Sequence, residues 1–184
     1  MEIEVKAKFD DREKVKEKLK LLGAVEEKEK HQIDEYYNHP AKDITKTNEY
    51  LRLRFAPNEN TGVFAHHINI ADGVNKEFEV GVSDVGVFKE ILKNLGFDLL
   101  GVIDKKRKTY SLDEFSITFD EVKDIGNFIE VEVDGEENEI EEKRNSCLEM
   151  LEKIGVSKDK LCKKIWLCDI ATGKTKLEDV LKDE

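Results

Sequence analysis

Several kinds of segment are missing from this sequence, and each absence excludes a class of protein. No apolar run approaches the roughly 20 residues that a membrane-spanning helix needs, and the charged N-terminus lacks the apolar stretch of a secretory signal. No basic run is interleaved with aromatic residues, and Asp plus Glu outnumber Lys plus Arg by 42 to 31. Such an acidic surface disfavours binding to nucleic acid and to anionic membranes, so we expect neither as a partner. Because membrane-spanning and secretory segments are missing, we expect a cytoplasmic protein.

Cysteine is rare in this sequence, and phosphate-binding loops are absent from it. The three cysteines, Cys147, Cys162 and Cys168, lack the paired close spacing of a zinc site. We therefore expect reduced, small core residues at these positions. The chain also has neither a Gly-rich phosphate loop nor a Ser/His/Asp order, so any chemistry must come from side chains that the fold positions.

What the sequence does have is strict alternation of apolar and charged residues. In residues 1–9, one face carries Ile3, Val5, Ala7 and Phe9, and the other carries Glu2, Glu4, Lys6 and Lys8. The Glu-x-Glu-Val core of this strand recurs at 77–80 and 130–133, and each copy is followed by a helical stretch that ends on an aliphatic residue and Gly. A solvated outer face would explain one such strand, whereas three copies favour a shared acidic face.

The pattern of elements predicts an α+β fold, an eight-stranded antiparallel closed β-barrel with flanking helices. We expect strands at 1–9, 50–55, 63–70, 76–80, 101–104, 105–112, 115–120 and 128–133, with an extended, hairpin-like passage at 25–37. Helices are expected from Asp10 or Asp11 to Gly23, from Ser83 or Asp84 to Gly96, from 136 to 154 and at 161–166. The apolar positions expected to point inward on the second helix are Val87, Phe88, Ile91, Leu92 and Leu95. The domain boundaries follow as a single domain at 1–170 and a charged C-terminal tail at 171–184.

The polar faces of these strands carry full charges of both signs. Their members are Glu2, Glu4, Glu77, Glu79, Asp120, Glu130 and Glu132 against Lys6, Arg52, Arg54, Lys76, Lys105 and Arg107. Clustered carboxylates need a compensating cation, and their hard oxygen atoms suit Mg²⁺ or Mn²⁺. Arginine and lysine side chains suit a polyanion. Together the two groups predict a site for a metal-chelated polyphosphate.

At these residues the chain resembles a known family. The motifs are Glu2-x-Glu4-x-Lys6, Asp34-x-Tyr36 with Pro40, Leu51-Arg-Leu-Arg54, Glu77-x-Glu79, Lys105-x-Arg107, the segment 112–120 and Glu130-x-Glu132. Their types and order are similar to those of the CYTH superfamily, the triphosphate tunnel metalloenzymes. This superfamily includes class IV adenylyl cyclases and thiamine triphosphatases, and the similarity is greatest to its CyaB-like branch.

The resemblance implies a tunnel that binds a nucleoside or organic triphosphate together with Mg²⁺ or Mn²⁺. By position, the metal ligands would be Glu2, Glu4, Glu130 and Glu132, supported by Asp120. The phosphate-binding residues would be Lys6, Arg52, Arg54 and Arg107, with Lys76 where an arginine is common, and Lys105 with Tyr36 would activate water. The reaction is either conversion of ATP to cyclic AMP and pyrophosphate or triphosphate hydrolysis. The organic group of the substrate and the oligomeric state, which includes a possible homodimer, are left open.

One departure from the family pattern concerns a lysine. CyaB-like relatives carry a phosphate-binding lysine on the strand where this chain has Ala65-His-His-Ile-Asn69. His67, or its neighbour His66, could take over this role if a bound polyanion raises the pKa of the imidazole. In the alternative interpretation the histidines are ordinary strand residues, and the chain is a catalytically weak polyphosphate-binding protein. Replacing His67 by lysine should raise turnover if the missing lysine is the deficit.

Overall fold

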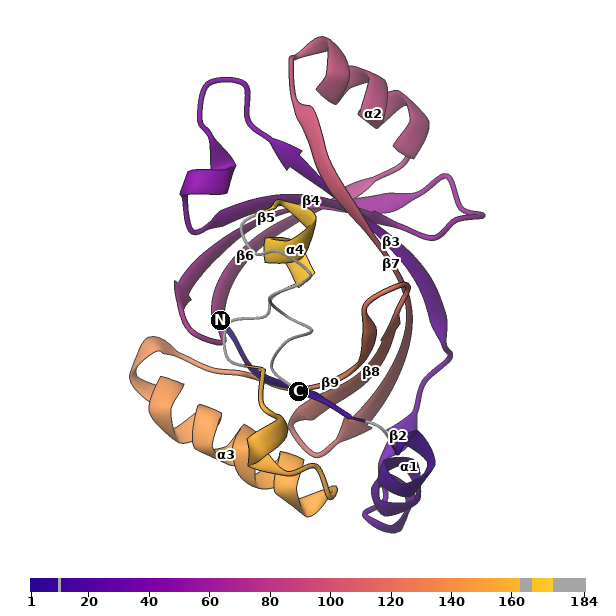
Figure 1. The fold of residues 1–184 in the computed structure, drawn as a ribbon, viewed down its shortest axis with the longest axis vertical. Coiled ribbons are helices and arrows are strands. Elements are labelled where there is room, and N and C mark those ends of the chain that lie inside the picture. The colour runs from indigo at the N-terminus through magenta and orange to yellow at the C-terminus, as the bar shows by residue number, and fades with distance from the viewer. Residues whose placement is uncertain (10, 163–166, 174–184) are drawn as a thin grey trace. The chain divides into compact units, whose positions relative to one another are not determined.

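The computed structural model describes residues 1–9, 11–162 and 167–173. The chain forms a closed eight-stranded antiparallel β-barrel with one additional short strand and a few flanking helices (Figure 1). The strand order is β2-β7-β3-β4-β5-β6-β1-β9-β8, and β8 also pairs with β7. The α+β barrel predicted from strand alternation is confirmed.

The elements follow one another along the chain with short connections. The strands are β1 (Glu2–Lys8), β2 (Val25–Glu26), β3 (Lys30–Asn38), β4 (Glu49–Phe55), β5 (Gly62–Ala71), β6 (Val74–Val82), β7 (Asp98–Leu112), β8 (Phe115–Val122) and β9 (Gly126–Asp134). The α-helices are α1 (Arg12–Leu21), α2 (Val85–Asn94), α3 (Ile140–Lys153) and α4 (Leu167–Ala171). Short 3₁₀ turns cover η1 (Ile44–Lys46), η2 (Glu137–Glu139) and η3 (Lys158–Lys160). No helix of the described residues combines the length and the apolar character that crossing a membrane requires.

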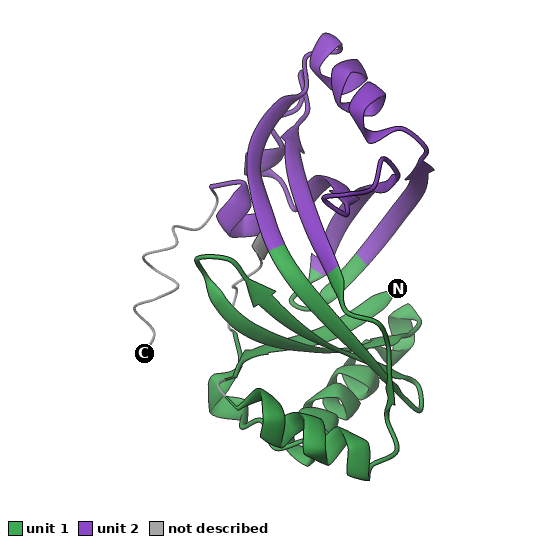
Figure 2. Ribbon diagram, turned by 90° about the vertical axis from the view of Figure 1, so that its right-hand side faces the viewer, with its two compact units in different colours: residues 1–30, 71–75, 105–163 green, residues 31–70, 76–104, 164–184 purple. Residues whose placement is uncertain are grey.

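The chain divides into two compact units, which Figure 2 colours separately. Unit 1 comprises Met1–Lys30, Ala71–Asn75 and Lys105–Lys163. Unit 2 comprises His31–Ile70, Lys76–Asp104 and Lys164–Glu184. The expected boundary of one domain at 1–170 stays a prediction.

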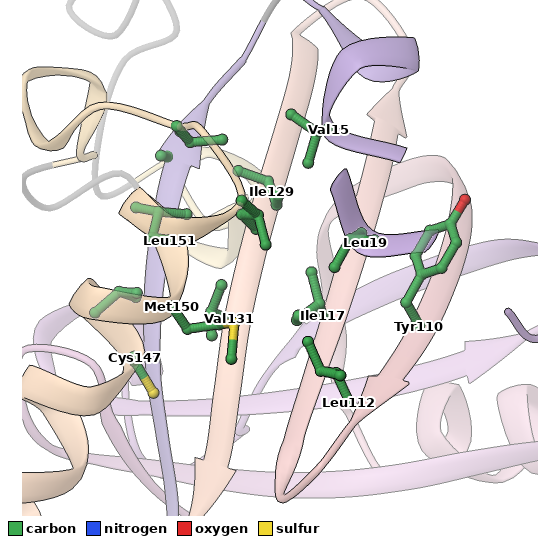
Figure 3. Packing of buried hydrophobic residues seen from close by; sticks show 14 of the residues in the cluster. Val15, Leu19, Tyr110, Leu112, Ile117, Ile129, Val131, Cys147, Met150 and Leu151 are labelled. Carbon is green, nitrogen blue, oxygen red and sulfur yellow. The ribbon is translucent and has the colours of Figure 1, made fainter. Parts of the chain in front are cut away.

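The hydrophobic core of unit 1 lies between one face of its strands and two helices. Figure 3 shows Leu19 of α1, Ile117 of β8, Val131 of β9 and Leu151 of α3, which all belong to one hydrophobic cluster. Each of these side chains is completely buried, and burial of such a side chain contributes roughly 1.5–3 kcal/mol. The Asp11 side chain accepts from the Lys14 amide and so caps α1, as one of the two predicted alternatives required. The other alternative, residue 10, lies outside the described residues.

The core of unit 2 shows that part of the prediction for α2 is wrong. Leu92 is buried in this core, but Val87, Ile91 and Leu95 are 57%, 48% and 62% exposed. A helix can present only one stripe to its neighbour, and the stripe that packs into this core is Val85, Phe88 and Leu92. Val87, Ile91 and Leu95 lie on other sides of the helix and therefore face solvent.

Other differences concern the ends of the chain and one long strand. Residues 98–112 form a single strand, β7, whereas two separate strands were expected there. Leu161 is not helical, because it forms an isolated antiparallel bridge with Ala7. The predicted helical structure at 165 and 166, and most of the predicted charged tail, at 174–184, lie outside the described residues. Cys147 is fully buried as expected, whereas Cys162 and Cys168 are half-buried, and all three are free thiols.

Candidate functional site

The face of unit 1 opposite its hydrophobic core carries charged side chains from four adjacent strands. Antiparallel pairing places Glu4 opposite Glu132 and Lys6 opposite Glu130, which itself pairs with Thr118. Because side chains alternate between the two faces of a strand, the apolar residues between these positions enter the core. The predicted residues Glu2, Glu4, Lys6, Lys105, Arg107, Asp120, Glu130 and Glu132 all belong to this unit. We call this set the acid–base cluster.

Two carboxylates of the acid–base cluster are engaged by buried cations. Glu130 accepts from the Lys6 ammonium at 2.6 Å and from the Arg107 guanidinium at 2.5 Å. Asp120 accepts from Arg107 at 2.7 and 2.5 Å and from the Lys105 ammonium at 3.0 Å. Burial by itself would raise the pKa of each carboxyl, but Arg107 and the two lysines outweigh it and hold both pKa values below the ordinary range. Glu130 and Asp120 are therefore ionised counter-ions.

Two other carboxyls of the cluster have the opposite tendency. Burial raises the pKa of Glu4 to about 8, and the charges of Glu130 and Glu132 add to this effect against that of Lys6. Burial, followed by the charge and the hydrogen bond of Glu2, raises the pKa of Glu132 to about 9. At neutral pH Glu4 and Glu132 therefore hold protons, a sign that their local environment has too little positive charge.

These observations bear on the predicted metal site. Carboxylate oxygens are the ligands that Mg²⁺ and Mn²⁺ prefer, and the raised pKa values of Glu4 and Glu132 indicate too little positive charge around these two carboxyls. Together with Glu2, which lies beside Glu132, their donor chemistry fits a divalent cation. In the part of the chain that the structure describes, however, no three His, Cys, Asp or Glu side chains are already arranged to hold an ion. Glu130 and Asp120, which the sequence also predicted as ligands, are paired with lysine and arginine instead.

Unit 2 has its own polar face, formed by β3, β4, β5 and β6. Register places Tyr36 opposite Arg52 and Asp34 opposite Arg54. The Arg54 guanidinium donates to both oxygens of Asp34, at 2.6 and 2.8 Å, and Arg52 donates to Glu79 at 3.3 Å. The fork of arginine matches phosphate as well as carboxylate. We call Asp34, Tyr36, Tyr50, Arg52, Arg54, His67, Glu77 and Glu79 the arginine–histidine cluster.

Helix α4 packs against this cluster. The Tyr50 hydroxyl donates to the Asp169 carboxylate at 2.5 Å, and a Cβ added to Gly101 of β7 would overlap with the carbonyl oxygen of Ala171. Tyr36 is buried, and burial and the nearby Asp34 charge raise the pKa of its phenol well above the ordinary value. Both phenols are thus neutral groups that offer a proton.

His67 forms a close pair with a carboxylate of the neighbouring strand. Its Nδ1 lies 2.5 Å from Oε1 of Glu77, while Nε2 is buried and has no hydrogen-bond partner among the described residues. Burial and the charges of Arg52 and Arg54 lower the pKa of the imidazole to about 3. His66, the other candidate, belongs to the opposite face of β5 and pairs with Glu49 at 2.8 Å.

One predicted position is not brought together with the rest of its unit, and one predicted pair is divided between the two units. The Lys76 ammonium lies 5.3 Å from the centre of the Phe78 ring, on the face of β6 opposite Glu77 and Glu79. Lys105 belongs to unit 1 and Tyr36 to unit 2, so their action as a pair stays a prediction. Sequence reasoning missed Thr118 as a partner of Glu130 and gave Glu77 no specific role in the site. Two-residue periodicity nevertheless places each of them on the polar face of its strand.

A model of the CYTH domain matches residues 1–164 of the chain. The chain belongs to the CYTH family. A Methanocaldococcus jannaschii protein named "Putative adenylate cyclase MJ0240" is 33% identical over 172 residues, which cover 91% of this chain and 97% of that protein.

Two solved structures have a fold similar to that of this chain. The PH1819 protein of Pyrococcus horikoshii has a TM-score of 0.81 and 29% identity, with 95% of this chain and 100% of that chain covered. A Hippeastrum protein, described as a putative adenylyl cyclase, HpAC1, with a dominant triphosphatase activity, has a TM-score of 0.66. It is 17% identical and covers 97% of this chain and 99% of its own, so it supports the fold alone.

Proposed function

We propose that this CYTH protein is a divalent-metal-dependent enzyme that acts on a triphosphate. The reaction is either hydrolysis of a phosphoanhydride or conversion of ATP to cyclic AMP and pyrophosphate. The two activities in the names of its relatives, adenylyl cyclase and triphosphatase, both begin from a triphosphate. A triphosphate substrate is therefore common to both candidate reactions.

One observation carries this proposal: the acid–base cluster holds buried cations beside carboxyls that lack compensation. Lys6 and Lys105 are only 8% and 4% exposed, and Glu4 is 7% exposed. Burial of charged groups is costly unless a function or a partner compensates it. A phosphoryl group with its cation would satisfy both halves of the cluster, because it brings negative charge for the lysines and positive charge for the acids.

The roles of the residues follow from their present partners. Lys6, Lys105 and Arg107 of unit 1, and Arg52 and Arg54 of unit 2, would donate to phosphoryl oxygens. Glu2, Glu4 and Glu132 would hold the cation, and Glu130 and Asp120 would orient the donors. When bound, the cation would neutralise charge on the phosphoryl oxygens in the transition state. The chain's own contribution is to position the phosphates and to keep the cationic groups aligned before the substrate arrives.

A substrate panel tests the proposal. The purified protein is incubated with Mg²⁺ or Mn²⁺ and with ATP, thiamine triphosphate or inorganic triphosphate, and phosphate, pyrophosphate and cyclic AMP are followed. We expect turnover of at least one substrate and a lower rate after addition of a chelator. If none of the three substrates is turned over, the protein is not this kind of enzyme.

A second candidate function is favoured by His67, which stands where CyaB-like relatives carry a lysine. In this reading the protein binds a metal-chelated polyphosphate but catalyses poorly. Calorimetry would then show binding of inorganic triphosphate with Mn²⁺ while the same panel yields no product. Product formation at a rate well above the uncatalysed reaction would argue against this candidate.

A further inference from the structure

The predicted water-activating pair leaves the proposed reaction without an evident base. Lys105 serves as a counter-ion, since its ammonium donates to the buried carboxylate of Asp120. Tyr36 is a neutral phenol whose pKa is raised by burial. Both groups offer hydrogen atoms, whereas an attacking hydroxyl has to lose one.

His67 offers what these two residues lack. A carboxylate can only accept a hydrogen bond, so the contact of 2.5 Å with Glu77 places the imidazole proton on Nδ1. The second ring nitrogen, Nε2, then carries the lone pair. It is buried and has no hydrogen-bond partner among the described residues, and the residue as a whole is 8% exposed.

The surroundings of His67 place phosphate-binding groups next to this lone pair. Tyr50 is opposite His67 in the β4–β5 register, and Arg52, two residues further on β4, is a diagonal neighbour on the same face. The Nε atom of Arg52 is also buried and without a partner in the described part of the chain. An unused acceptor and an unused donor thus lie in one cluster, as a hydroxyl next to a phosphoryl oxygen would require.

We propose that His67, oriented by Glu77, is the general base that deprotonates the oxygen nucleophile of the triphosphate reaction. This inference rests on the proposed function and adds a catalytic residue to it. The Nε2 lone pair takes the proton of the attacking hydroxyl, and the hydroxyl oxygen forms a bond to phosphorus. The bridging P–O bond breaks, and its electron pair leaves with the departing phosphate or polyphosphate. The Glu77 carboxylate stabilises the imidazolium that results.

Substrate binding would strengthen this base. The charges of Arg52 and Arg54 are among the causes that lower the pKa of His67 in the ligand-free protein. A phosphoryl group bound by these arginines neutralises that effect and adds negative charge, and both changes raise the pKa of the imidazole. The histidine would therefore gain basicity at the moment when the nucleophile is in place.

Three substitutions separate this role from a phosphate-binding role. In His67→Gln we expect kcat to fall by roughly 100- to 10,000-fold, the usual range for loss of a general base, with little change in KM. In His67→Lys we expect a comparable loss, whereas a simple substitute for the family's lysine would gain activity. His66→Gln is the matched control, because this residue faces the other side of β5, and its rate should equal that of the wild type.

The pH dependence supplies a readout that a structural role would not move. For inorganic triphosphate, kcat of the wild type should fall on the acid side as His67 becomes protonated, because kcat reports the pKa values of the enzyme–substrate complex. The other titratable or charged groups around His67 are Tyr50, Arg52 and Arg54 of β4, Asp34 and Tyr36 of β3, and Glu77 and Glu79 of β6. Glu77→Gln should move the acid limb to lower pH, because the imidazolium loses its carboxylate partner, and His67→Gln should abolish the limb.

Nitrogen NMR of the imidazole checks the geometry without any turnover. We expect the Nδ1–H tautomer in the free protein and a titration that moves to higher pH when inorganic triphosphate is added. An Nε2–H tautomer would overturn the assignment even if His67→Gln did not fold. If the wild type is inactive on every substrate, the proposed enzyme and the base both fail. If the wild type is active but His67→Gln keeps its rate and its acid limb, only the base assignment fails.

Discussion

The most direct test of the acid–base cluster is the substitution Glu132→Gln. Glu132 is a half-buried carboxyl beside Glu2, and its pKa is raised from the ordinary value of 4.5 to about 9. At pH 4.5 or below the carboxyl is protonated in both the folded and the unfolded state, so it costs nothing. As the pH rises above 4.5, the unfolded chain loses the proton and the folded chain keeps it, so the free energy of unfolding falls.

The size of this effect follows from the two pKa values. Between 4.5 and pH 7 the loss accumulates over roughly 2.5 pH units at about 1.36 kcal/mol each, which gives about 3 kcal/mol. Glutamine remains neutral at every pH, and its amide can donate to Glu2 as the protonated carboxyl does. We therefore expect Glu132→Gln to be more stable than the wild type at pH 7 by up to about 3 kcal/mol, or roughly 6–12 °C in Tm for a chain of this size.

Thermal melts at pH 5, 7 and 8 without added metal measure this prediction. The difference in Tm between Glu132→Gln and the wild type should be small at pH 5 and should widen as the pH rises. Glu149→Gln is the control, because it makes the same change of charge at an exposed position of α3. A difference that does not depend on pH, or a variant less stable than the wild type at pH 8, would refute the reasoning.

Three further predictions follow from the contacts of the described residues. Glu130→Gln should lower the free energy of unfolding by about 3–5 kcal/mol in urea melts at pH 7, because Lys6 and Arg107 lose a buried ionised partner; a loss below that of an exposed Glu→Gln change would contradict this. Mn²⁺ with inorganic triphosphate at about 100 times its Kd should stabilise the wild type by about 2.7 kcal/mol. Arg107→Lys, which keeps the charge but loses the fork, should show a smaller shift in Tm, and a full shift would count against a phosphate-binding role. Gly101→Ala should speed hydrogen exchange at 167–173, because the new methyl group overlaps with the Ala171 carbonyl oxygen. Gly86→Ala is the control, because a methyl group has room there and should leave the exchange unchanged. Equal exchange rates in the two variants would exclude the contact between Gly101 and Ala171.

The sequence predicted the faces of the strands better than the partners of the side chains. Alternation alone separates Ile3 and Val5, which are buried in the core, from Glu4 and Lys6 on the polar face. This inference is local, because a strand places successive residues on opposite sides whatever its neighbours are. The same rule could have excluded Lys76, which alternates with Glu77 and therefore cannot share its face.

Pairing across strands was not predictable, because it depends on register and on charges that are far apart in the sequence. Lys6 and its partner Glu130 are separated by more than a hundred residues, and the spacing of the acids does not reveal which of them a cation already neutralises. The orientation of α2 was missed for a similar reason, since it depends on which of its apolar stripes packs against residues of other elements such as Leu51 and Leu53. The Glu-to-Gln substitutions at 130 and 132 looked equivalent in the sequence, yet the structure predicts opposite effects on stability for them.

The ion pairs of Glu130 and Asp120 also bear on the order in which ligands can bind. These carboxylates occupy the donor groups of Lys6, Lys105 and Arg107 that a phosphoryl group would need. A polyanion that displaces them leaves buried negative charge without a counter-ion, a state that is costly unless a cation arrives as well. Each ligand should then raise the affinity of the other by the same factor, as linkage requires. Preference for the metal chelate over either free component would thus arise from the competition already present in the empty protein.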